Sequence, residues 1–170
     1  FLDEDADPNL ALSAIFHDLV YYQVDDGFQP ELAGVVTKFV DQTEQGVHIR
    51  TDIPASNVLF HATLHLFGFQ EGQVLLPFTG LNEFLSALVF VDLLDGHLDA
   101  REIMAVVTCI EGSIPFRKPG ADGILPFDRL YLRLRDLVDR GMLAASDSDI
   151  RSMVDRAVLF ANKDVKDFCN

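Results

Sequence analysis

Two segments of this chain are apolar on nearly every side of a helix, and they limit the fold more than any other feature. Residues 9–23 and residues 81–94 carry large apolar side chains at almost all helical positions. Such a helix has to be surrounded by other elements, because water would meet apolar surface on any side left open. Asp7 and Pro8 suit the N-cap and first turn of the first helix. The sequence therefore predicts two central helices inside a larger assembly.

Other segments have apolar residues on one side only, with the spacing of amphipathic helices. They are residues 30–40, 57–67, 100–114, 127–140 and 147–168. Asp99 is placed to cap the third of them, while alternation around residues 64–69 leaves a strand open as an alternative for the second. Residues 46–56 are expected to form a loop and residues 77–80 a turn. We therefore predict an all-α, single-domain bundle of about six or seven helices over residues 1–170.

The charge balance narrows the range of partners. The chain has 27 acidic and 13 basic residues, a formal net charge of −14. Nucleic acids and anionic membranes bind basic surfaces, so we expect neither as a partner, and the apolar runs are shorter than the roughly 20 residues of a membrane span. Two cysteines without disulfide or metal spacing indicate a cytoplasmic protein. A small ligand or a protein, with self-association left open, is the expected partner.

Ionisable side chains fall on the apolar faces of the first and last predicted helices. His17 and Asp18 share a partly apolar face of residues 9–23, and Asp164 lies on the apolar stripe of residues 147–168. Buried ionisable groups are costly unless they are paired or bound to metal, and imidazole and carboxylate are both common metal ligands. The alternatives are a hydrogen-bonded or solvated His-Asp pair and, for Asp164, a structural cap or ion pair.

These residues carry a resemblance to a known family. The run 14–22, Ala-Ile-Phe-His-Asp-Leu-Val-Tyr-Tyr, resembles the signature helix of the HD-domain metal-dependent phosphohydrolases, and the run 161–164, Ala-Asn-Lys-Asp, resembles their late helix with its metal-ligating Asp. The resemblance implies an HD-domain-like helical fold with His17, Asp18 and Asp164 as ligands of a divalent metal (Mn, Fe, Mg, Ni or Zn). It also implies hydrolysis of a small phosphorylated metabolite or nucleotide by a metal-activated water.

The sequence departs from the family in one respect. The family usually has another histidine on a preceding helix, and this chain has none before His17. Because the sequence starts at Phe1, we expect either a fragment or processed product that lacks this ligand, or a degenerate site. His61 and His65 have a spacing that lets two imidazoles share a metal, the alternative being two polar residues on an outer face. A catalytically degenerate ligand-binding or protein-interaction module, or an unrelated helical interaction module, also remains open.

Five further residues complete the predicted site. Glu83 and Glu111 lie on otherwise apolar helices and could act as a general base, support a metal ligand or pair with Arg117. Arg117 and Lys118 are the best placed to bind a substrate phosphate, since arginine binds such oxygens with two parallel hydrogen bonds; a solvated surface pair is the alternative. Tyr21, beside the His-Asp pair, could line the pocket or serve only in packing.

Overall fold

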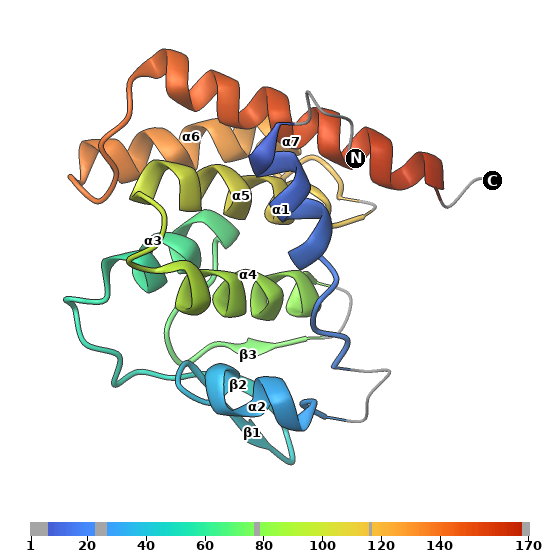
Figure 1. Cartoon of the computed structure of the whole chain (residues 1–170), viewed down its shortest axis with the longest axis vertical. Helices are drawn as coiled ribbons and strands as arrows, with labels where there is room; N and C mark the ends of the chain where they lie inside the picture. The colour runs from blue at the N-terminus through green and yellow to red at the C-terminus, as the bar shows by residue number, and fades with distance from the viewer. Residues whose placement is uncertain (1–6, 23–26, 77–78, 116, 168–170) are drawn as a thin grey trace.

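The protein is predominantly helical, as predicted, but it also contains a small sheet. The computed structural model describes residues 7–22, 27–76, 79–115 and 117–167, with side chains to residue 164. The helices in this part of the chain are α1 (Pro8–Phe16), α2 (Pro30–Val36), α3 (Val58–Phe67), α4 (Leu81–Leu94), α5 (Ala100–Gly112), α6 (Pro126–Asp139) and α7 (Asp147–Asp167). The strands β1 (Val40–Thr43), β2 (Gly46–Ile49) and β3 (Val74–Leu75) form an antiparallel sheet in that order. Figure 1 shows α6 and α7 at one end of the molecule and the sheet with α2 at the other.

Helices α4 and α5 form the centre of the molecule. α4 has the predicted bounds and is fully buried along most of its length, and α5 packs against α7, α1 and α4. α5 begins with the predicted cap: the Asp99 carboxylate accepts from the Glu102 backbone N–H, and the Glu102 carboxylate accepts from the Asp99 N–H. Each bond satisfies a backbone donor that the first turn of a helix leaves free. Local sequence therefore determines where α5 begins.

The first helix is shorter and more exposed than predicted. α1 ends at Phe16, and Ile15 is 63% exposed, so the expectation of a central helix continuing to residue 23 is wrong. The backbone N–H of Val20 donates to Ser86 Oγ at 3.0 Å, and that of Tyr22 donates to Asn82 Oδ1 at 3.2 Å. Ser86 and Asn82 of α4 thus accept hydrogen bonds from backbone N–H groups that would bond within α1 if that helix continued. The chain accordingly leaves the helix after Phe16.

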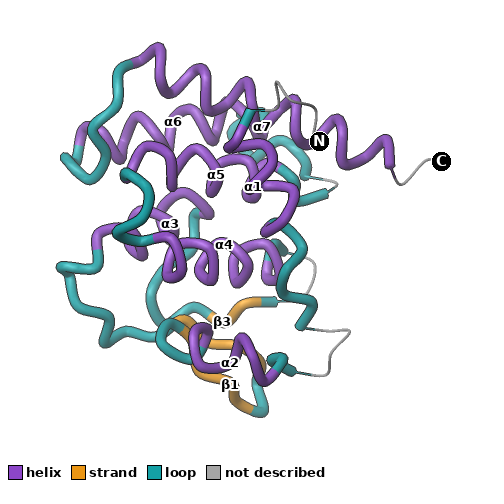
Figure 2. The backbone as a smooth tube through the Cα atoms, in the orientation of Figure 1, coloured by secondary structure: helices purple, strands orange, loops and turns teal. Residues whose placement is uncertain are grey.

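The sheet is the main departure from the predicted all-α fold. Residues 30–40 form a helix only as far as Val36, and the expected loop of residues 46–56 begins with strand β2 instead. In the hairpin, β1 pairs with β2 through Val40 opposite Ile49 and Thr43 opposite Gly46. Val47 and Ile49 are buried on one face of β2, an alternation too short to indicate a strand in the sequence. Figure 2 shows the sheet and α2 together beside α4.

The remaining helices follow the predicted pattern. The Asn57 side chain caps α3 by accepting from the Phe60 backbone N–H at 3.1 Å, and α6 and α7 begin within one residue of the predicted positions. The end predicted for α7 at residue 168 and part of the turn at residues 77–80 lie outside the described residues. Among the helices that are described, none is both long and apolar enough to cross a membrane.

Candidate functional site

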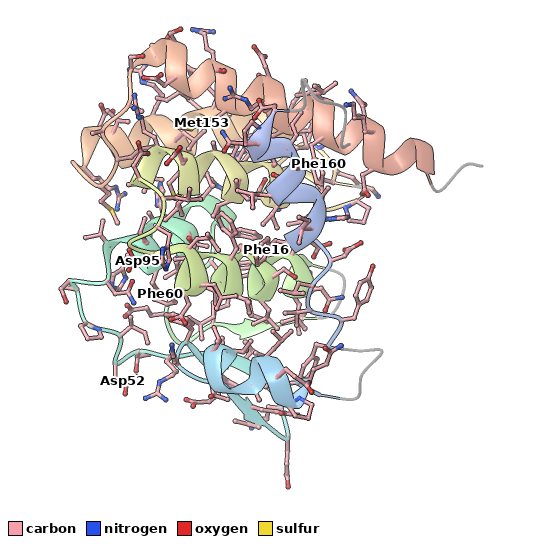
Figure 3. All side chains as sticks on the ribbon, viewed as in Figure 1. Phe16, Asp52, Phe60, Asp95, Met153 and Phe160 are labelled. Carbon is pink, nitrogen blue, oxygen red and sulfur yellow. The ribbon has the colours of Figure 1, made fainter. Side chains whose placement is uncertain are left out.

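The first and last helices along the chain meet at a cluster of three ionisable residues. His17 is the C-cap of α1, Asp18 follows it, and Asp164 lies near the end of α7, which packs against α1. His17 Nε2 is 3.1 Å from Asp18 Oδ2 and 3.2 Å from Asp164 Oδ1. Phe160, labelled on α7 in Figure 3, packs edge-on against the imidazole ring at 5.2 Å. The structure thus brings together these three residues, which we call the His17 cluster.

The second ring nitrogen of His17 determines what Nε2 can do. Nδ1 lies 3.1 Å from the carbonyl oxygen of Ala14. Because a carbonyl oxygen can only accept a hydrogen bond, Nδ1 carries the proton. In the neutral imidazole Nε2 then has a lone pair. This atom is buried, and neither nearby carboxylate is aligned with it as a hydrogen-bond partner. A lone pair between two carboxylates is repelled by both, so the arrangement requires a proton or another cation on Nε2.

In the absence of a metal, the cluster can satisfy this requirement by protonation. Burial disfavours the imidazolium, but the contact and charge of Asp18, the charge of Asp164 and the Ala14 carbonyl outweigh burial and raise the pKa of His17 above 6.5. The contact with His17 in turn lowers the pKa of Asp18. The side chains of Asp18 and Asp164 remain 37% and 22% exposed. The cluster is therefore acidic and open to solvent on its carboxylate side.

Two of the other predicted site residues adjoin this cluster. The Tyr21 hydroxyl donates a hydrogen bond to Asp18, and burial together with the nearby carboxylates raises the pKa of Tyr21 to about 12. Tyr21 therefore remains a hydrogen-bond donor at neutral pH. Burial also raises the pKa of Glu83 on α4, and the charge of Asp18 adds to this effect while Arg117 and His17 oppose it. A buried carboxyl group with a raised pKa is a candidate general base or acid.

A second ionic cluster lies deeper in the molecule. Glu111 at the end of α5 is fully buried, and its Oε1 contacts Nη1 of Arg117 and, at 3.4 Å, Nη1 of Arg133. Arg133 Nη1 also donates to the Leu66 carbonyl oxygen at 2.9 Å. The predicted alternative that Glu111 pairs with Arg117 is therefore seen. We call Glu111, Arg117 and Arg133 the Glu111 cluster.

The Glu111 cluster has one unsatisfied atom. Glu111 Oε2 is buried and has no hydrogen-bond partner in the described part of the chain, and leaving a buried polar atom unpaired typically costs about 1–3 kcal/mol. Burial raises the pKa of Glu111, while the charges of Arg117 and Arg133 oppose the rise. Sequence analysis missed Arg133, although its position three residues after the buried Leu130 would have indicated a cation facing the core.

A small cavity adjoins the Glu111 cluster. It has a volume of about 180 Å³ and is lined by residues from the end of α5, the following turn, the start of α6 and Ala161 of α7. A larger hollow of about 430 Å³ lies at the start of α3 and at Asp95, the residue after α4 that is labelled in Figure 3. Asp95 is the one ionisable residue among those lining the larger hollow. The smaller cavity is lined by both Glu111 and Arg117, so it is the better candidate for a binding site.

The remaining predicted site residues lie elsewhere. His61 Nε2 is 3.1 Å from the Pro54 carbonyl oxygen and its Nδ1 is 3.5 Å from Glu71, while His65 Nε2 is 3.0 Å from Asp136. The two histidines of α3 thus have different partners. Lys118 is exposed on the loop before α6. Within the described residues, no group of three or more His, Cys, Asp or Glu side chains is placed so that it could hold a metal ion.

Comparison with known proteins identifies no relative. The chain matches no family profile, no curated protein and no solved structure.

Proposed function

We propose that the His17 cluster binds a divalent metal ion and that the protein is a metal-dependent phosphohydrolase of the HD-domain type, acting on a small phosphorylated metabolite or nucleotide. The observation that carries the proposal is the environment of His17 Nε2. This buried atom lies 3.1 and 3.2 Å from two carboxylate oxygens and has no aligned hydrogen-bond partner among the described residues, while Nδ1 is held by a backbone carbonyl. Metal-ligating histidines are commonly oriented by such a bond from the other ring nitrogen.

The donor set suits the proposed ion. One imidazole nitrogen with two carboxylate oxygens is a combination that Mn, Fe and Zn all accept, and the ion would replace the proton that His17 otherwise binds. Because the three donors are not already arranged as a metal site, binding would require Asp18 and Asp164 to adjust. Both carboxylates are partly exposed, and the Tyr21 hydroxyl that donates to Asp18 would move with it. Further ligands would be water or substrate oxygens, which leaves coordination positions for chemistry.

The surrounding residues have roles that fit phosphoester hydrolysis. A bound divalent ion would supply a water with a lowered pKa and would polarise the phosphate. Glu83, whose own pKa is raised by burial, would accept a proton from the attacking water or return it to the leaving group. The Tyr21 hydroxyl holds Asp18 in place. Arg117, which is 25% exposed, would offer its remaining N–H donors to a phosphate oxygen.

The second candidate is a ligand-binding module of the same fold without catalysis. The observation that favours it is the protonated state of the His17 cluster, in which the charge of His17 between Asp18 and Asp164 takes the place of a metal ion. In that case the carboxylates would bind a cationic or hydrogen-bond-donating ligand or partner.

Metal content separates the two candidates. Elemental analysis by mass spectrometry would be done on protein purified without chelator or metal-affinity resin, next to a His17→Ala, Asp164→Ala double variant. The control is Asp155→Ala, which removes an exposed carboxylate from the same helix. We expect about one equivalent of Mn, Fe or Zn in the wild type and in the control, and its loss in the double variant.

Activity then tests the reaction. Metal-loaded wild-type protein should release phosphate from p-nitrophenyl phosphate or from one of a panel of nucleotides, and Glu83→Gln should retain the metal while losing at least about 100-fold in kcat. Wild-type protein that contains no metal and takes up none on incubation with Mn²⁺, Fe²⁺ or Zn²⁺ would refute the proposal and favour the non-catalytic module.

A further inference from the structure

The cavity beside the Glu111 cluster has the features of a specific subsite. Its volume of about 180 Å³ is below the roughly 300–1,000 Å³ typical of pockets that enclose a whole small ligand. It therefore has room for one compact group rather than for a complete substrate. Its walls are mostly apolar, with Phe127 and Leu130 from α6 and Ile114 from the turn after α5. The polar side of the cavity is formed by Glu111 and Arg117.

Glu111 provides the feature that calls for a ligand. The side chain is fully buried and lines the cavity, yet its Oε2 has no hydrogen-bond partner among the described residues. Its other oxygen, Oε1, is the atom that contacts Arg117 and Arg133. A buried carboxylate oxygen without a donor is rare in folded proteins, so a group that enters the cavity and donates a hydrogen bond to Oε2 would remove this cost.

The local charge defines the entering group further. Two guanidinium groups surround one carboxylate, so the cluster already has more positive than negative charge when Glu111 is ionised. An additional ammonium group would be repelled by both arginines. An anion inside the cavity would have no donor for Glu111 Oε2 and would lose its hydration against the apolar walls. The group that fits is therefore neutral, partly apolar and equipped with an O–H or N–H donor.

The cavity is close enough to the His17 cluster to serve the same molecule. Ala161, at its edge, precedes Asp164 by three residues on α7, a rise of about 4.5 Å along the helix axis. Arg117, on the cavity wall, also acts electrostatically on Glu83, which in turn is coupled to Asp18 and His17. We infer that this cavity binds a compact, neutral, donor-bearing group of the substrate whose phosphate is hydrolysed at the His17 cluster. This inference rests on the proposed function only in assuming that the bound molecule carries a phosphate.

Binding of ring probes to the metal-free wild-type chain tests the cavity by itself. Phenol carries one O–H donor, while fluorobenzene has nearly the same size and no donor. We expect phenol to bind at least about 5-fold more tightly in a titration followed by ¹H–¹⁵N NMR, with the largest shifts at the amides of Gly112, Ser113 and Ala161. Equal affinity of the two probes, or shifts confined to other parts of the chain, would overturn the inference.

A matched pair of variants locates the site without altering the Glu111 cluster. Ala161→Leu adds bulk at the edge of the cavity, whereas Ala144→Leu makes the same change at an exposed position between α6 and α7. Ala161→Leu should weaken phenol binding at least about 10-fold and Ala144→Leu should leave it unchanged. Unchanged binding in Ala161→Leu would count against the cavity. Because these titrations contain no metal, they fail or succeed independently of the metal analysis that tests the proposed hydrolase.

Discussion

The His17 cluster and the Glu111 cluster use similar chemical groups in opposite ways. In the His17 cluster one imidazole lies between two carboxylates, and the side chains are 15%, 37% and 22% exposed for His17, Asp18 and Asp164. In the Glu111 cluster one carboxylate lies between two guanidinium groups and is completely buried. Solvent near the first cluster lowers the cost of changing its charge or its partners, whereas burial makes any change in the second expensive. The His17 cluster can therefore change its charge and its partners, whereas the Glu111 cluster is expected to keep its ion pairs.

The contrast predicts a large difference in stability when each cluster loses a carboxylate. Glu111→Leu would leave Arg117 and Arg133 without their anionic partner, and removing one member of a buried ion pair costs about 3–5 kcal/mol. Asp18→Asn should cost less than about 1 kcal/mol, because Asp18 is 37% exposed. Urea unfolding of both variants at pH 7 measures the difference. Similar losses in the two variants would mean that the clusters do not differ as described.

A substitution of the glycine that ends α3 tests how firmly Arg133 of the Glu111 cluster is held. Gly68 ends α3 with a φ of +71°, and a Cβ atom there would overlap the guanidinium of Arg133. Gly96 has a similar φ of +79° but open space around it. Gly96→Ala should therefore show the backbone cost alone, about 1–2 kcal/mol. Gly68→Ala should lose roughly 1 kcal/mol more, because Arg133 has to give up its bond to the Leu66 carbonyl.

Urea unfolding of the two alanine variants gives this difference directly. If Gly68→Ala and Gly96→Ala lose the same free energy of unfolding, Arg133 is held less firmly than the geometry indicates.

The smallest predicted effect concerns the charge of the His17 cluster in metal-free protein. The pKa of His17 is raised above 6.5 in the folded state, so protonated His17 stabilises the fold below about pH 6.5, and this contribution is lost as the pH rises through the folded-state pKa. His17→Gln should therefore lower the free energy of unfolding more at about pH 5.5 than at about pH 8.5, by at most about 1 kcal/mol given the partial exposure.

An NMR titration of the His17 ring in metal-free protein provides the direct measurement. A pKa at or below 6.5 would contradict the assigned environment of His17, and so would a larger effect of His17→Gln at high pH than at low pH.

Parts of this molecule could be predicted from sequence because their causes are local. The ends of α4 and the start of α5 follow from apolar periodicity and from the cap at Asp99. The meeting of His17 with Asp164 is what the resemblance to the HD-domain helices implies, whereas the apolar faces of the two predicted helices indicated only that these ionisable groups need partners. Helix phase placed Asp164 on the apolar side of α7, whereas His17 and Asp18 follow the end of α1 and lie on no helical face.

Other parts depended on contacts between distant segments. Nothing within residues 9–23 indicated that Ser86 and Asn82 of α4 would bond the backbone after α1 and end that helix early. The strand β2 has four residues and a partner on each side, so pairing rather than its own pattern defines it. The interaction of Arg133 with Glu111 joins α6 to α5 across 22 positions of sequence. The end of α1 and the pairing of β2 leave no local periodic signal, and helical spacing gives the side of α6 on which Arg133 lies but not its partner Glu111.

The sequence by itself determined the helical character of the chain, the bounds of α4, the start of α5 and the side of α7 on which Asp164 lies. These properties depend on neighbouring residues and on the burial of apolar side chains. The tertiary structure decided the distances within the His17 cluster, the closure of the Glu111 cluster and the cavity beside it. Such features arise where separate elements pack together, because a cavity or an ion pair between helices is defined by the space that several distant segments leave or fill.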